Sequence, residues 1–345
     1  MTDTRFAELH QWVRQNLNQP EAELVPLAGD ASFRRYFRAS AQGRTWMVMD
    51  APPPQEDCQP FVALQSWLAA QQVRVPALLA ADLARGFVLL EDLGTTLLSQ
   101  VIQADNASAL YSQAMNQLIH LQKAALPPAL PEYDAARLMA ELRLFDQWFL
   151  PALLQLTLSP EEQALLEQTY QLLVDSALEQ PQVLVHRDFH ARNLMVLDQE
   201  AALGIIDFQD AVAGPVTYDL VSLLRDAYVA WPDELVRGWV HLYWQRAQIA
   251  GLMPAVAERT VQRWFDWMGA QRHLKVLGIF VRLSVRDGKH GYLGDLHRVL
   301  AYLLAECRPY PELGAFVAWL EQRVQPVFAE RLAQRLDALA QGQQP

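Results

Sequence analysis

One polar segment constrains this chain of 345 residues more than any other feature. Residues 186–193 read HRDFHARN and lie between two short strand-like runs, and a third such run ends at Asp207, fourteen residues after Asn193. A loop between two strands can direct Asp188 and Asn193 into one cleft, and the return strand then brings Asp207 to the same place. The sequence therefore predicts a hairpin that gathers three polar side chains.

These residue types fit the transfer of a phosphoryl group. That reaction needs a carboxylate beside the attacking hydroxyl and metal ions that neutralise the phosphate oxygens. The oxygen ligands of Asn193 and Asp207 suit Mg²⁺, which takes one or two protein carboxylates together with nucleotide phosphates. Taken singly, each residue is more commonly a turn residue or a cap, but order and spacing together favour a site. A metal site on His186, Asp188 and His190 is less favoured, because no further ligand cluster accompanies them.

The patterns along the chain change from strand-like to helix-like at about Gly94. Short runs of β-branched, aromatic and large apolar residues dominate before it, and apolar residues at helical spacing dominate after it. We expect an α+β fold with a small β-rich N-lobe, residues 1–93, which binds a nucleotide, and a large helical C-lobe, residues 94–345. The expected strands are 24–27, 33–39, 45–50, 75–80, 86–91, 183–185, 194–197 and 202–206, and the expected helices include 61–70, 96–123, 132–150, 160–178 and most of 216–345.

The composition excludes several classes of protein. The formal net charge of −11 argues against nonspecific binding to nucleic acid. The cysteines, Cys58 and Cys307, fit no metal-ligand spacing and favour a reducing compartment. The first residues, MTDTRF, lack the features of a signal peptide, and the apolar stretches are interrupted before they reach bilayer-spanning length. We expect a cytoplasmic monomer with no nucleic-acid or membrane partner.

Several motifs together resemble the aminoglycoside phosphotransferase and choline kinase family, which has a two-lobed protein-kinase-like fold. The motifs are HRDFHARN at 186–193, IIDFQDA at 205–211, PVTYDL at 215–220 and a hinge-like GFVLLEDLG at 86–94. The resemblance implies ATP as the phosphoryl donor and Mg²⁺ as the metal. We expect Asp219 to tie the following helix to the catalytic loop and His186 to brace that loop.

The resemblance also implies a role for individual positions. Asp188 would accept the proton of the substrate hydroxyl, and Asn193 and Asp207 would hold magnesium. Two segments would contact the nucleotide, namely a turn with Gly29 and Ser32 over the phosphates and backbone groups around Glu91 and Leu93 at the adenine.

The third strand departs from the family pattern. It normally carries a lysine, or sometimes an arginine, for the α- and β-phosphates, paired with a glutamate on the next helix. Here residues 46–50 read WMVMD and include no basic residue. Arg34, Arg35 and Arg38 of the neighbouring strand are the candidates for the positive charge. The missing lysine also suggests an alternative, a catalytically inactive nucleotide-binding module.

Further segments resemble a narrower group, the bacterial anomeric sugar kinases, over nearly the whole chain. They are GDASFRRYFR at 29–38, VMDAPP at 48–53 and FDWMGAQRHLKVLG at 265–278. In that group the absence of the strand lysine is expected. The resemblance implies phosphorylation of the C1 hydroxyl of N-acetylmuramate and N-acetylglucosamine in peptidoglycan recycling. A kinase of the same fold that acts on an aminoglycoside, choline or a homoserine-like acceptor is the alternative.

A basic segment bears on the choice of acceptor. Residues 258–298 hold eight Lys or Arg against four acids, although the chain is acidic overall. In the helix expected there, Arg272, Lys275, Arg282 and Arg286 fall on one face at about 100° per residue. Such a stripe suits a carboxylate-bearing ligand such as N-acetylmuramate, because arginine grips a carboxylate with two parallel hydrogen bonds. We expect Arg272 and Lys275 to bind substrate; the alternative is a stripe that faces solvent.

Overall fold

The computed structural model describes residues 4–27, 33–197 and 202–342, and the chain divides into two compact units. Unit 1 contains Met1–Ala129 and Ala191–Ala211, and unit 2 contains Leu130–His190 and Val212–Pro345. Asp188 therefore belongs to unit 2, whereas Asn193 and Asp207 belong to unit 1. The functional lobe boundary predicted after residue 93 stays a prediction.

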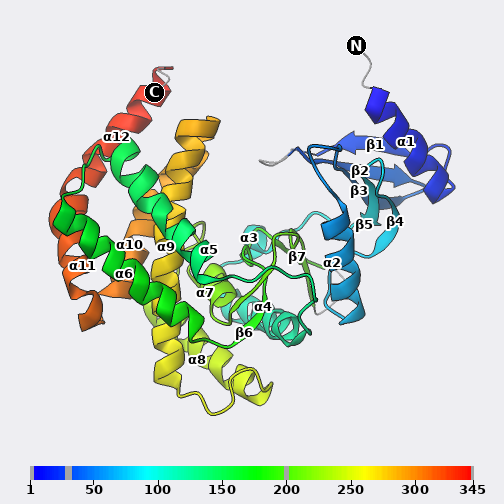
Figure 1. The fold of residues 1–345 in the computed structure, drawn as a ribbon. Coiled ribbons are helices and arrows are strands. Elements are labelled where there is room, and N and C mark those ends of the chain that lie inside the picture. The colour runs from blue at the N-terminus through cyan, green and yellow to red at the C-terminus, as the bar shows by residue number, and fades with distance from the viewer. Residues whose placement is uncertain (1–3, 28–32, 198–201, 343–345) are drawn as a thin grey trace. The chain divides into compact units, whose positions relative to one another are not determined.

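Unit 1 contains an antiparallel sheet of five strands in the order β1-β2-β3-β5-β4 (Figure 1). Side chains alternate between its two faces, as they must in a strand. On one face Phe37 and Val48 pack with Leu9 and Val13 of the N-terminal helix α1 and form a buried core. The bounds are α1 Thr4–Leu17, β1 Glu23–Pro26, β2 Arg35–Ala41, β3 Arg44–Asp50, β4 Leu78–Asp82 and β5 Phe87–Glu91.

The rest of unit 1 consists of helices and a short hairpin. Strands β7 and β8 pair antiparallel, with Leu194 opposite Ile205. The helix predicted over 96–123 is wrong in one respect, because non-helical residues from Ile102 to Asn106 divide it in two. The bounds are α2 Gln59–Ala70, α3 Leu98–Val101, α4 Ala107–Lys123, β7 Leu194–Val196 and β8 Leu203–Ile205.

Unit 2 is helical and is organised around α9, a helix of 30 residues (Figure 1). Helices α5, α6, α7, α10 and the π-helix η1 pack against α9. Two glycines allow close contact, because a side chain at Gly269 would collide with Glu306 and one at Gly278 would collide with the Leu144 backbone. The helix bounds are α5 Ala135–Leu144, η1 Phe145–Leu153, α6 Pro160–Leu178, α7 Tyr218–Leu224, α8 Asp233–Ile249, α9 Glu258–Asp287, η2 His290–Asp295, α10 Leu296–Cys307, η3 Pro311–Leu313, α11 Gly314–Trp319, η4 Leu320–Val324 and α12 Gln325–Ala340.

A two-stranded ribbon of unit 2 leads into the segment that carries Asp188. Strand β6, Gln182–Val185, pairs antiparallel with β9, Val212–Pro215. The sequence analysis predicted β6 and did not predict β9 or α1. Within the described residues, no helix combines the length and the apolar character that crossing a bilayer requires.

Candidate active site

The hairpin of unit 1 brings Asn193 and Asp207 together, as the sequence predicted. Asn193 directly precedes β7 and Asp207 follows β8, and the Ile206 N–H donates to the Asn193 carbonyl at 3.1 Å. The Asn193 side-chain amide lies 3.3 Å from Asp207 Oδ2, and the Gln209 amide donates to Asp207 Oδ1 at 2.7 Å. Asp207 has a φ of 65°, a strained backbone value of the kind that concentrates at functional sites.

The donor groups at this hairpin fit magnesium. A carboxylate and an amide oxygen are hard ligands of the kind that Mg²⁺ takes together with water and phosphate oxygens. Among the described residues, no group of three or more His, Cys, Asp or Glu side chains is arranged to hold a metal ion. The alternative metal site on His186, Asp188 and His190 is therefore not supported.

A cavity of about 540 Å³ adjoins the hairpin within unit 1. This volume lies in the range of small-molecule pockets. One part of the lining is apolar, and the Phe61 ring stacks on Phe208 at a centroid distance of 5.0 Å. The other part is polar and includes both predicted metal ligands. The polar lining residues are Arg34, Tyr36, Asn193, Asp207, Gln209 and Asp210, and the apolar ones include Leu27, Met47, Pro76, Leu90 and Ile206.

The two residues predicted to contact adenine, Glu91 and Leu93, follow closely in the sequence after a residue that lines this cavity. Leu90 lines the cavity, and Glu91 ends strand β5. The Glu91 N–H already donates to the Ala77 carbonyl at 2.9 Å, and its carboxylate accepts two hydrogen bonds from Arg74. Leu93 is buried against Gly204 of β8. Roles for Glu91 and Leu93 at the adenine stay predictions, and Gly29 and Ser32 lie outside the described residues.

In unit 2 the segment that carries Asp188 is anchored to helix α7. The buried carboxylate of Asp219 accepts hydrogen bonds from the backbone N–H of His186 at 2.7 Å and of Arg187 at 3.0 Å. The buried His186 ring lies 3.3 Å from the Asp188 N–H. The predicted tie through Asp219 and the predicted brace through His186 are both confirmed. Burial raises the pKa of Asp219 to about 6, although His186 and the two N–H groups lower it.

The side chain of Asp188 is half-buried, with 49% of it exposed. Removal from bulk water favours the neutral acid, but the positive charges of Arg272 and, next, Lys275 outweigh it and lower the pKa of Asp188 to about 2. The Arg272 guanidinium lies 3.7 Å from the carboxylate. Asp188 is therefore ionised at neutral pH.

The two basic residues predicted to bind substrate are held by groups of unit 2. Arg272 donates to the Arg187 carbonyl at 2.8 Å and to the Tyr218 hydroxyl at 3.0 Å. Lys275 lies 2.9 Å from the Tyr218 hydroxyl and 2.9 Å from Glu141. Both side chains are buried, at 10% and 9% exposure. Their role toward substrate stays a prediction, and the contacts assign them to the support of the Asp188 segment.

The structure adds Tyr218 and Glu141 to the surroundings of Asp188, and sequence reasoning missed both. Tyr218 directly precedes Asp219 in the PVTYDL motif, so its place in that motif was an available signal. Glu141 bonds Arg187 at 2.7 Å and also accepts from Tyr133. It lies 46 residues before Arg187 on another helix, and no local pattern marks it.

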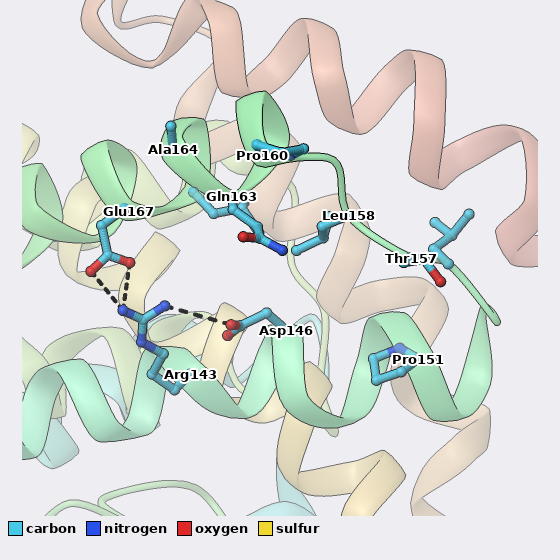
Figure 2. Close-up of a pocket in the computed structure, with 11 residues that line it drawn as sticks. Arg143, Asp146, Pro151, Thr157, Leu158, Pro160, Gln163, Ala164 and Glu167 are labelled. Carbon is cyan, nitrogen blue, oxygen red and sulfur yellow. Dashed lines mark hydrogen bonds and ion pairs between the residues drawn. The ribbon is translucent and has the colours of Figure 1, made fainter.

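Unit 2 also has a cavity of about 720 Å³ that contains none of the predicted site residues (Figure 2). Residues of α5, η1 and α6 and the intervening loop line it. Its charged groups satisfy one another, since Arg143 lies between Glu167 and Asp146 and forms ion pairs with both (Figure 2). None of the residues that line this cavity belongs to the network around Asp188.

Comparison with known proteins agrees with this arrangement. The model of the phosphotransferase enzyme family matches residues 23–258. A Pseudomonas putida protein named N-acetylmuramate/N-acetylglucosamine kinase is 45% identical over 332 residues, covering 92% of this chain and 97% of that protein. A protein of the same name from Neisseria meningitidis is 42% identical, covering 93% of this chain and 96% of its own. The structure of a Plasmodium vivax ethanolamine kinase has a TM-score of 0.64 at 12% identity, covering 89% of this chain and 88% of that one.

These matches test two predictions from the sequence. The ethanolamine kinase and a choline/ethanolamine kinase family protein from Mesorhizobium loti, with a TM-score of 0.58, share the fold of this chain. The predicted protein-kinase-like class, with a small β-rich part and a large helical part, is confirmed. The family match includes Asp188, Asn193 and Asp207, and the relatives match nearly the whole length. This chain belongs to the phosphotransferase enzyme family.

Proposed function

We propose that this protein transfers the γ-phosphoryl group of ATP to the C1 hydroxyl of N-acetylmuramate and N-acetylglucosamine, in the cytoplasm and in peptidoglycan recycling. The names and the 42–45% identity of the two relatives support the choice of substrate. The observation that carries the reaction type is the ionised, half-exposed carboxylate of Asp188. It lies five residues before Asn193, whose side chain is of a type that binds Mg²⁺.

In the proposed reaction, Asp188 orients the anomeric hydroxyl and receives its proton. The sugar oxygen forms a bond to the γ-phosphorus, the bond from that phosphorus to the bridging oxygen breaks, and ADP leaves. A carboxylate with a pKa of about 2 is a weak base. Asp188 therefore takes the proton late, when the forming bond from the sugar oxygen to phosphorus has made that proton more acidic. Orientation of the hydroxyl is then its larger contribution.

The metal and the nucleotide are assigned to unit 1. Asn193 and Asp207 would hold Mg²⁺, which when bound neutralises charge on the phosphate oxygens. The apolar lining of the cavity, which includes Met47, Leu90 and Ile206, suits a flat purine ring. The polar lining then faces the phosphates.

Phosphorus NMR tests this proposal. The protein is incubated with magnesium-ATP and either N-acetylmuramate or N-acetylglucosamine, and parallel tubes contain an aminoglycoside, choline or homoserine. A new phosphorus resonance coupled to the anomeric proton of the sugar is the expected result. Phosphate on C6 would support a sugar kinase but would contradict phosphorylation of the anomeric hydroxyl. ATP left intact with both sugars would overturn the proposal, and turnover of another acceptor would identify the correct class.

A further inference from the structure

Of the three arginines that are candidates to replace the strand lysine, Arg34 is the one that lines the unit 1 cavity. We propose that Arg34, positioned by Glu56, is the cation that binds the phosphates of ATP in the unit 1 cavity. This inference rests on the proposed function in one respect, since it takes ATP to be the ligand. It assigns to two residues outside β3 and α2 the task that a strand lysine and a helix glutamate share in protein kinases.

The first argument is the alternation of side chains along β2. Arg34 directly precedes β2, and it lines the cavity together with Tyr36, whereas Arg35, the first residue of β2, shares a face of the sheet with Phe37. The lining of the cavity contains Arg34 and Tyr36, and it also contains Met47 of β3. Strand β3 therefore presents a methionine at the cavity where protein kinases have lysine, and the residue directly before the adjacent strand β2 is an arginine.

The second argument is that the other two candidates are held elsewhere. Arg35 lies 2.6 Å from Asp50, whose fully buried carboxylate also binds Arg5 of α1 on the opposite face of the sheet. Arg38 shares a face of β2 with Tyr36, but its guanidinium forms two hydrogen bonds to Asp92, at 2.7 and 3.2 Å. Neither Arg35 nor Arg38 lines the cavity.

The third argument is the charge around Arg34. It is the one cation among the described residues that line the cavity, where Asp207 and Asp210 also lie. Without it, the phosphates of a nucleotide would face carboxylates with no cation from the described lining beside them. Its position in the sequence agrees, because Arg34 follows the turn at 29–32 that the family resemblance places over the phosphates.

The fourth argument is that Arg34 is held in place. Its Nε lies 3.1 Å from Glu56 Oε2, and the two side chains are 17% and 15% exposed. Glu56 is in the loop between β3 and α2 and is fixed by a hydrogen bond from its N–H to the Pro52 carbonyl. A partly buried arginine with an oriented partner loses little freedom when it binds phosphate, and its planar fork matches phosphate oxygens.

The test compares nucleotide binding in Arg34→Met with that in the wild-type protein, by calorimetric titration with magnesium-ATP and, separately, with adenosine. We expect ATP to bind about ten- to a hundredfold more weakly and adenosine to bind within about twofold of wild type. Arg34→Lys keeps the charge and should recover part of the loss. The matched control is Arg35→Met, which removes the neighbouring arginine on the opposite face and should leave both affinities unchanged.

A double variant tests the role of Glu56. If Glu56 acts by positioning Arg34, Glu56→Gln should weaken ATP binding by severalfold, and Arg34→Met/Glu56→Gln should bind ATP no more weakly than Arg34→Met alone. Full additivity of the two losses would overturn the positioning role. Equal weakening of ATP and adenosine by Arg34→Met, or no change in either, would make Arg34 only a structural partner of Glu56.

Turnover assays separate this inference from the proposed function. A wild-type protein that binds ATP and phosphorylates neither sugar would overturn the function, while a selective loss of ATP binding in Arg34→Met would still support the inference. A wild-type protein that binds no ATP would overturn both. Sugar phosphorylation by wild type together with unchanged ATP affinity in Arg34→Met would overturn the inference alone.

Discussion

The surroundings of Asp207 in unit 1 and of Asp188 in unit 2 differ in what their charged groups contact. Asp207 lies at a cavity of about 540 Å³ with an apolar wall, where there is room for a ligand. Around Asp188, the nearby cations are bonded to the chain itself, Arg272 to the Arg187 carbonyl and Lys275 to Glu141. From this difference we infer that unit 1 binds the nucleotide and that the network of unit 2 orients the carboxylate of Asp188. Substitutions should therefore separate binding from turnover.

Asp188→Asn should have the largest effect on turnover and little effect on nucleotide binding. We expect kcat to fall about 10²–10⁴-fold, because an amide neither orients the hydroxyl with a charge-assisted hydrogen bond nor accepts its proton. ATP affinity should stay near that of wild type, because the cavity belongs to unit 1. Steady-state kinetics and calorimetry measure the two quantities. In the matched variant of unit 1, Asp207→Ala, magnesium-ATP binding should weaken as well. A comparable loss of ATP binding in Asp188→Asn would break the comparison.

Arg225→Met extends the comparison to a second charged network of unit 2. The guanidinium of Arg225 is 3% exposed and lies 2.9 Å from Asp266 and 3.0 Å from Glu306, which are 1% and 0% exposed. Its removal takes the guanidinium from two buried carboxylates, which keep His273 beside Glu306 and the Tyr310 hydroxyl beside Asp266, so we expect the free energy of unfolding to fall by about 3–5 kcal/mol. Urea denaturation measures the loss. Arg308→Met is the control, because its ion pair with Glu321 is exposed, shares no partner with Arg225 and should contribute less than about 1 kcal/mol.

Arg272→Met tests whether the network around Asp188 holds its carboxylate in the charged form. We expect kcat/KM at neutral pH to fall about tenfold or more, as is usual for loss of a charge-assisted contact. The guanidinium is the largest cause that lowers the pKa of Asp188 to about 2, so its removal raises that pKa. As pH falls through the raised pKa, the carboxylate protonates and activity declines, so the acid limb of the pH–rate profile moves upward.

The profile of kcat/KM between about pH 4 and 8 measures this shift. Arg272→Lys keeps the charge and should restore most of the wild-type profile. Arg286→Met is the control on the same helix, because Arg286 is 56% exposed and pairs with its neighbour Asp287. An unchanged acid limb in Arg272→Met would mean that Arg272 acts on the fold of the segment and not on the charge of Asp188.

Arg143→Ala at the cavity of Figure 2 should have the smallest effect. The Arg143 side chain is 35% exposed, and its partner Glu167 is 52% exposed. Exposed ion pairs contribute about 0–1 kcal/mol and weaken with salt. We expect thermal unfolding to shift slightly at low salt and not at high salt, with turnover of the sugars unchanged. A clear loss of turnover would show that this cavity takes part in the reaction and would revise the comparison.

Local elements were predictable where the deciding signals are local. Helix α6 has the range that was predicted, and the structure shows the local signals that start it: Ser159 and Glu162 form a capping box, and Pro160 follows the cap. Helix α1 was missed, although Phe6, Leu9, Val13 and Leu17 recur at helical spacing. Strand β9 was missed because its partner β6 lies 27 residues or more away, and pairing of that kind leaves no local pattern.

The sequence by itself determined the order Asp188, Asn193, Asp207 and the hairpin that brings the last two together, because a short hairpin is closed by neighbours in the chain. It left Arg34, Arg35 and Arg38 open, since alternation says which of them share a face and not which face α1 covers. The tertiary structure decided that point by packing α1 against Phe37. It also decided the environment of the basic stripe, because a helix face becomes a solvent face, a binding face or a buried support only through what packs against it.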